Sequence, residues 1–379
     1  MFFNSDNLRM VFAEENSYKN FRRIAFSLVS GNTADVYDYD ENGNEKRISK
    51  ADMNKAVVRV FCKVLGLSEE DLNSPKKRHR ALASDRGYDL YDLIEEDIDY
   101  KINEGYAQSE WFNDLVDSRN LALGDKPEFV ISQNTLFLVA DVSGDNHDIT
   151  MQQLPEGKVL TLNTTAHAIK IGKDIDLVLL GRIDYAEMVS RIADSFVNAT
   201  QNLVSDELKA ASDKLPAFCK MTGDLAKTTK DQFDQLIENV ETLNSSDVMI
   251  VGTRVALKKL NALADVDWIS DSQKEAVAST GRLGTYEGTT LLEIPQRIKV
   301  GSLDDSASSL TTLVSNDELY IIPRVENKFI KFVDEGETEI VEVTEKAALQ
   351  DDFQTYEVQR RYGAAVVLGS GYFGKWSKA

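Results

Sequence analysis

The run of residues from Asp184 to Pro216 constrains the fold more than any other part of the sequence. Asp184 followed by Glu187 is typical of a helix start, and apolar residues then recur at alternating spacings of four and three. These apolar positions are Tyr185, Val189, Ile192, Phe196, Ala199 and Leu203. A helix of roughly thirty residues is about 45 Å long. That length suits a spine across which other elements lie.

The apolar face of this helix leaves two interpretations open. It covers about three heptads, which is the lower limit for a coiled coil, and it equally fits a helix that lies on a sheet. We favour the helix on a sheet.

Short helices between polar loops are predicted for residues 1 to about 120. The clearest runs from Ser49 to Leu65, where Ser49 and Asp52 form the start signal and Gly66 the stop. Asn42-Gly43 before it suits a tight turn.

Residues 129 to about 180 have the composition of β-strands. Branched and aromatic runs alternate with turn-forming segments in this stretch. The runs are FVIS, TLFLVADV, KVLTLNT, HAIKI and IDLVLL. We interpret them as an extended β-rich excursion.

An α/β region follows the long helix. A helix is predicted from Thr229 to Leu243, and Thr253 is the expected cap of another. VMIVG, LLEIP and ELYIIP predict strands. Further on, KFIKFV and EIVEV are predicted as strands on either side of DEGE, followed by a TEKAALQDDF insert and by AAVVLG.

Charge and cysteine content exclude several classes of function. Lys plus Arg number 43 and Asp plus Glu 63, so the net charge is −20 and tight binding of a phosphate backbone by the whole surface is disfavoured. Cys62 and Cys219 are too few for a disulfide framework. No secretory signal and no run of eighteen apolar residues is found, so we expect a cytosolic chain without a membrane segment.

The glycine-rich stretch LGSGYFGKWSKA is the one motif that suggests a nucleotide. Gly369, Gly374 and Lys375 approach a phosphate-binding loop, but Trp376 occupies the position of the Mg²⁺ ligand and little chain remains for the helix. We therefore expect a flexible or interface-docked tail, and a nucleotide-binding enzyme stays a distant alternative.

No other pattern indicates catalytic, cofactor or metal chemistry. His79, His147 and His167 are not paired at helix spacing, and there is no nucleophile elbow. The acidic stretch from Asp92 to Asp99 lacks the spacing of a calcium loop, which favours a solvated helix face. We expect no enzyme, no cofactor and no metal.

Two charge clusters lie close together in the sequence. The basic one is Lys76, Lys77, Arg78, His79 and Arg80, and the acidic one is Asp92, Glu95, Glu96, Asp97 and Asp99. They could pair with each other or with neighbouring residues. A salt-bridged surface is favoured over a nucleic-acid site because the basic run has no interleaved aromatic residues.

In their order along the chain, these elements resemble the major capsid protein of tailed bacteriophages, which has the HK97-like fold. Several strings are similar to that family: TAHAIKIGKDIDLVLLGRIDYAEMV, SSDVMIVGTRVALKKL, GRLGTYEGTTLLEIPQRI, NDELYIIP and QTYEVQRRYGAAVVLGSGYFG. The resemblance covers about residues 125–379 and rests on element order rather than on active-site residues.

The resemblance implies an α+β fold with five segments. They are an N-terminal arm or helical region (1–124), an extended β-hairpin called the E-loop (125–165), a peripheral domain with the spine helix (166–216), an α/β axial domain (217–322), and a β-rich return with the C-terminal tail (323–379).

The resemblance also implies a function. Many copies would form pentamers and hexamers that close into an icosahedral shell around double-stranded DNA, assembled in the bacterial cytoplasm and carried in the virion. Scaffolding, portal and decoration proteins are the implied partners, without sequence-specific DNA binding or a membrane. Candidate contacts between subunits are Lys76, Lys77, Arg78, Arg80, Glu95, Glu96, Asp97, Arg360 and Arg361. An encapsulin-like compartment of the same fold and another structural virion protein are the alternatives.

Overall fold

A computed structural model describes most of the chain and divides it into two compact units. The described residues are 5–13, 17–32, 37–39, 45–125, 127–131, 151–152, 158–172, 174–263, 283–297, 312, 314–343, 355–369 and 371–378. Unit 1 comprises Met1–Ser109, Thr164–Thr200 and Glu335–Tyr362, and unit 2 comprises Glu110–Asn163, Gln201–Asp334 and Gly363–Ala379. Each unit is assembled from three separate stretches, so the chain crosses between them several times.

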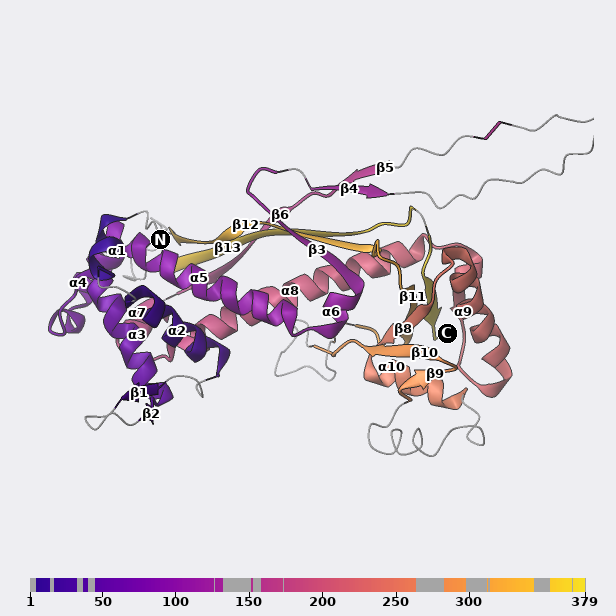
Figure 1. Cartoon of the computed structure of the whole chain (residues 1–379), viewed down its shortest axis with the longest axis horizontal. Helices are drawn as coiled ribbons and strands as arrows, with labels where there is room; N and C mark the ends of the chain where they lie inside the picture. Colours follow the sequence, from indigo (N-terminus) through magenta and orange to yellow (C-terminus); the bar gives the residue numbers. More distant parts are fainter. Residues whose placement is uncertain are drawn as a thin grey trace, which may run out of the picture. The chain divides into compact units, whose positions relative to one another are not determined.

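The first part of unit 1 is helical, as predicted. Its helices are α1 (Asp6–Val11), α2 (Ser17–Ser30), α3 (Lys50–Leu65), α4 (Pro75–Leu82) and α5 (Asp85–Ala107) (Figure 1). A short antiparallel pair, β1 (Tyr37–Tyr39) and β2 (Glu45–Arg47), follows α2 and precedes α3 in the sequence. Helices α2, α3 and α5 pack against one another. Ser49 caps α3 by accepting the Asp52 amide at 3.2 Å, and Gly66 ends it in the left-handed region at φ 67°.

Unit 1 also contains β6 (Thr165–Ile171) and α7 (Asp174–Leu179). The prediction of a strand for IDLVLL was wrong, because residues 174–179 form a helix. Asp174 and Asp176 lie in its first turn, where carboxylates interact favourably with the helix dipole. This local signal outweighs the β propensity of the apolar residues.

The predicted long helix is confirmed as α8 (Tyr185–Asp213), which is 29 residues long. Asp184 accepts the Ala186 amide at 3.1 Å at its start. Tyr185, Val189, Ile192 and Phe196 are buried along the predicted face. The first part of α8, up to Thr200, belongs to unit 1 and the remainder to unit 2.

A six-stranded sheet is the centre of unit 2. Its order is β7 (Lys220–Thr222), β14 (Gly374–Ser377), β11 (Glu318–Pro323), β8 (Val248–Gly252), β10 (Thr289–Glu293) and β9 (Thr285–Tyr286). β8 pairs parallel to β10 and antiparallel to β11. Helices α9 (Lys230–Asn244) and α10 (Arg254–Lys258) share one apolar core with the sheet. Figure 1 shows both helices beside the strands. The predicted helices and strands of this region are confirmed.

The C-terminal stretch is not the flexible or interface-docked tail expected from the sequence. It forms β14, hydrogen-bonded between β7 and β11, and Trp376 is completely buried in the core. Its glycines serve close packing. A Cβ on Gly371 would meet the Asn244 side chain at 1.9 Å, and the Asn244 amide donates to the Tyr372 carbonyl at 2.8 Å. Lys375 is engaged with Glu318 at 3.1 Å.

A four-stranded sheet has the order β3 (Val116–Leu121), β12 (Ile330–Val343), β13 (Thr355–Val366) and β6. The sequence suggested two strands on either side of DEGE, but β12 is continuous over 14 residues. Gly336 adopts φ 79° inside the strand, a conformation open to glycine, and this lets the strand continue through the polar segment.

The expected β-hairpin is described only at its base, where β4 (Glu128–Ile131) pairs antiparallel with β5 (Lys158–Thr161). Three other expectations lie outside the described residues, namely the TLFLVADV strand, the Asn42-Gly43 turn and the TEKAALQDDF insert. The expected α+β class is confirmed. Among the described helices, none combines the length and hydropathy needed to span a membrane.

Candidate functional site

The basic cluster lies on α4 and divides into surface and interior residues. Lys76, Lys77 and Arg80 are exposed, but Arg78 is only 5% exposed. The Arg78 guanidinium donates to both carboxylate oxygens of Asp176 on α7, at 2.6 and 3.0 Å, and this hydrogen bonding raises the pKa of Arg78. Arg78 therefore joins two helices inside unit 1 and is not a surface residue.

Lys77 is exposed and already has a partner in its own chain. It pairs with Asp71, and together with hydrogen bonds from Ser68 it lowers the pKa of that carboxyl to about 2. An ion pair at the surface is screened by solvent and contributes little to the stability of a fold. Another carboxylate can therefore replace Asp71 at small cost.

The acidic cluster on α5 is not the solvated helix face that the sequence suggested. Asp97 is completely buried, with Arg22 donating to it at 2.7 Å and the Tyr185 hydroxyl donating to its other oxygen. Burial raises the pKa of Asp97 to about 6, although Arg22 opposes the rise. Glu96 is exposed and pairs with the same Arg22 from the outside.

Glu95 lies one helical turn before Asp99 and faces β12. Its carboxylate accepts the backbone N–H of Ile340 at 2.6 Å, and burial raises its pKa to about 7. Asp99 accepts from the Thr338 hydroxyl at 2.6 Å and pairs with Arg360. Helix α5 is thus tied to β12 and β13 through its acidic side chains.

The two arginines of β13 point to opposite faces, as neighbours in a strand do. Arg360 is 4% exposed and donates to Asp99 and to the Thr338 hydroxyl, whereas Arg361 is exposed. Of the two alternatives left open for the charge clusters, the described contacts of Arg78 and Asp97 fit the second: Arg78 pairs with Asp176 and Asp97 with Arg22, both within unit 1. Arg78, Asp97 and Arg360 are interior residues.

Sequence reasoning missed a buried lysine at the base of the hairpin in unit 2. Lys331 is 2% exposed, and its ammonium donates to Asp117 and to Asn327, each at 2.6 Å. Phe129 lies between two cations, with the Arg119 guanidinium 4.3 Å and the Lys331 ammonium 5.3 Å from its ring centroid. The signal was available, since Lys331 interrupts the otherwise apolar run of KFIKFV.

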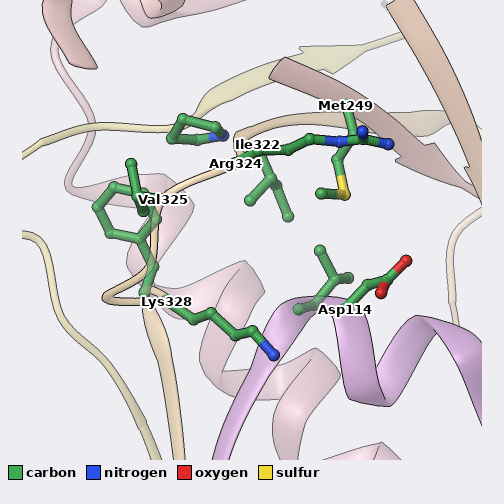
Figure 2. Close-up of a pocket in the computed structure, with 9 residues that line it drawn as sticks. Asp114, Met249, Ile322, Arg324, Val325 and Lys328 are labelled. Atoms are coloured by element: carbon green, nitrogen blue, oxygen red, sulfur yellow. The ribbon is translucent and has the colours of Figure 1, made fainter. Parts of the chain in front are cut away.

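A cavity of about 380 Å³ in unit 2 was also not foreseen (Figure 2). Met249 and Ile322, which are register partners in β8 and β11, line it together with Phe329. Figure 2 shows the charged side chains of Asp114 and Lys328 around this apolar part. Lys328 donates to the carbonyls of residues 113 and 116 beside α6 (Glu110–Leu115). The lining contains no histidine, cysteine or serine side chain, and Lys328 is engaged with backbone carbonyls.

The remaining candidates for chemistry do not form a site. Within the described part of the chain, no group of three or more His, Cys, Asp and Glu side chains is placed to hold a metal ion. His167 stacks on Tyr362 at 4.0 Å, and burial lowers its pKa, while His147 lies outside the described residues. Cys62 and Cys219 are free thiols, as expected, and burial raises the pKa of both.

Comparison with solved structures finds capsids and related particles at low sequence identity. The mature capsid of bacteriophage PhiM1 matches with 11% identity and a TM-score of 0.45, over 71% of this chain and 86% of that one. The procapsid of satellite phage P4, which includes the size determination (Sid) protein, matches with 13% identity and a TM-score of 0.43, over 74% of this chain and 90% of that one. A virus-like particle from Pyrococcus furiosus matches with 9% identity and a TM-score of 0.42, over 76% of this chain and 99% of that one. No curated protein matches the sequence.

Comparison with protein families gives the decisive result. The family described as "SPbeta prophage-derived putative capsid protein YonB" matches residues 30–377, which is nearly the whole chain. The description names a capsid protein, which is a structural component and not an enzyme. The chain belongs to the YonB family of prophage-derived capsid proteins.

Proposed function

We propose that many copies of this chain assemble as pentamers and hexamers into an icosahedral shell that encloses double-stranded DNA. The observation that carries the proposal is the match to a capsid protein family over residues 30–377. Shell closure makes each later contact intramolecular, so individually weak contacts suffice and misplaced subunits can dissociate. Assembly takes place in the host cytoplasm, with scaffolding, portal and decoration proteins as partners.

The exposed members of the candidate contact set carry the interactions between subunits. They are Lys76, Lys77, Arg80, Glu96 and Arg361. Copies with a net charge of −20 repel one another, so places where cations gather are where attraction between copies is concentrated. The buried members of the set, Arg78, Asp97 and Arg360, hold unit 1 in the shape that presents these surfaces.

The same negative charge suits a container for DNA. A shell that bound many phosphates would retain its genome, whereas an acidic inner surface repels it. No reading of base sequence is required.

The test is negative-stain electron microscopy of the purified chain over a range of salt and protein concentrations, with sedimentation alongside. We expect shells, or the five- and six-fold rings that precede them. A chain that stays at 42.4 kDa under every condition, also with its scaffolding protein present, would contradict the proposal. Nucleic acid extracted from native particles supports the phage shell, and an enzyme cargo in its place would indicate an encapsulin-like compartment.

A further inference from the structure

A cavity of about 470 Å³ lies between α4 and α7 in unit 1. Leu72, Pro75, Leu177 and Leu180 form its apolar part, and the buried Arg78–Asp176 pair forms part of its wall. Two further basic side chains, His79 and Arg182, line it, and both residues are exposed. The cavity therefore combines an apolar interior with basic residues at the solvent.

Arg182 has no hydrogen-bond or ion-pair partner for its side chain among the residues the structure describes. Its backbone N–H donates to the Leu177 carbonyl at 2.9 Å, which fixes the position of the main chain beside the cavity. Lys76 and Arg80 lie exposed on the adjoining helix α4. Arg182 in the lining and Lys76 and Arg80 on α4 thus bring exposed cations to the elements that form the cavity, in a chain whose net charge is −20.

The outer face of α5 has the opposite character. Asp85, Tyr88 and Asp92 are spaced by three and four residues, so they lie on one face of the helix, and all three are exposed. Tyr88 is 55% exposed, and its ring is held edge-on against Tyr91 at 5.9 Å. The α5 face is therefore an aromatic side chain with a carboxylate on either side.

The two surfaces are complementary. An aromatic ring matches an apolar cavity, and the flanking carboxylates match the cations at its rim. Tyrosine and arginine are the residues that most often dominate interface energies, because they combine large contact area with polar groups. Since Tyr88 is exposed in its own chain, its ring does not occupy the cavity of that chain.

We propose that the α5 face of one copy, Asp85, Tyr88 and Asp92, docks into the α4–α7 cavity of a second copy, with Tyr88 in the apolar part and a carboxylate on Arg182. The inference rests on the proposed function and specifies one of its contacts. Because the two surfaces are different patches of unit 1, the contact is heterologous and repeats head to tail, which is how rings of subunits are closed.

A charge exchange tests the contact. Arg182→Glu and Asp92→Arg each place like charges together, and the double variant restores an opposite pair across the interface. We expect each single variant to raise the protein concentration at which shells form by about tenfold or more, and the double variant to recover most of that loss. Arg59→Glu is the matched control, because Arg59 is an exposed arginine on α3 that neither lines the cavity nor belongs to the α5 face.

Tyr88→Ala provides a test that does not depend on charge, and we expect about a tenfold higher assembly concentration. Thermal unfolding of each variant separates a lost contact from a lost fold. Single variants that assemble at the wild-type concentration, or a double variant no better than the worse single one, would overturn the inference and leave the proposed function intact. Wild-type protein that never assembles would overturn both.

Discussion

The six-stranded sheet of unit 2 and helix α5 of unit 1 both bury apolar side chains, but only α5 adds a buried charge to them. The sheet buries an apolar core in which strand β8 is covered along its whole length, and Phe233, Leu257, Leu319 and Trp376 each show at most 1% exposure. Helix α5 buries an apolar face that includes Ile94 and Ile98, and it also buries Asp97 and ties Glu95 and Asp99 to other elements through hydrogen bonds.

The difference decides how each region responds to change. The free energy gained by burying apolar side chains is proportional to the buried area and depends little on which apolar side chain is the partner. The stability of the sheet is therefore insensitive to pH and tolerant of conservative substitution. A buried charge is stable only with its partner present, since an unpaired charge in the interior costs several kcal/mol. The α5 region is therefore the one in which a single polar substitution or a change of pH has the larger specific effect.

The largest effect is expected for Trp376→Ala in the sheet. The side chain is completely buried, and its indole N–H donates to the Gly223 carbonyl at 3.0 Å, so truncation leaves both a cavity and an unpaired carbonyl. We expect the free energy of unfolding to fall by about 4 kcal/mol in urea titrations. Lys378→Ala, at an exposed residue of the same stretch, is the control, and a loss below about 1 kcal/mol for Trp376→Ala would show that this strand is not part of the core.

Asp97→Ala tests the polar side of the comparison. It leaves Arg22 buried without the carboxylate that it contacts at 2.7 Å, and we expect a loss of about 3 kcal/mol in the same titrations.

The paired variant Arg22→Met with Asp97→Leu removes both charges at once. It is expected to be less destabilised than Asp97→Ala, because no unpaired charge remains inside. If the double variant lost as much free energy of unfolding as Arg22→Met and Asp97→Leu lose together as single variants, the two side chains would act independently. That result would contradict the contact seen in the structure.

The same contrast explains how much the sequence could predict. The strands VMIVG and ELYIIP, the helix from Thr229 and the long helix from Asp184 follow from apolar periodicity and capping residues, and all are present. The burial of the C-terminal stretch did not follow, because a short segment rich in glycine fits a free tail as well as a strand. Its pairing between β7 and β11 and the packing of Gly371 on Asn244 depend on residues that are distant in the sequence.

The partners of the charged residues could not be predicted from the sequence. Asp97 pairs with Arg22, which is 75 residues away, and Arg78 pairs with Asp176, which is 98 residues away. Spacing along one helix says which side chains share a face, but it does not say what packs against that face. For this reason the acidic stretch was interpreted as solvated, although part of it lies in the interior.

Removing a helix cap is expected to lower the free energy of unfolding by a smaller amount, and a buried cap in unit 2 can be compared with a surface cap in unit 1. Thr253 in unit 2 is 1% exposed, accepts the Ala256 amide at 3.2 Å and donates to Asn316 at 2.8 Å, whereas Ser49 in unit 1 caps α3 at the surface. We expect Thr253→Ala to cost about 2 kcal/mol and Ser49→Ala about 1 kcal/mol in urea titrations. Equal costs would show that burial adds nothing to the cap.

The smallest effect is a pH dependence confined to the α5 region, and Glu95 determines its sign. Burial raises the pKa of Glu95 from 4.5 to about 7, with Asp92, Asp99 and Glu339 adding like charge. The folded protein therefore binds this proton more tightly than the unfolded chain. The stabilisation is fully present below about pH 4.5 and is lost as the pH rises through about 7.

Glu95→Gln isolates this contribution, because the amide oxygen can still accept the Ile340 N–H while the charge is absent. We expect the variant to match the wild type near pH 5 and to exceed its free energy of unfolding near pH 8. Hydrogen exchange should show that α5 and β12 open more readily at pH 8 than at pH 6 in the wild type, after correction for intrinsic rates, and that β8 does not. If β8 responded equally, the pH dependence would belong to the whole protein and the contrast between the two regions would fail.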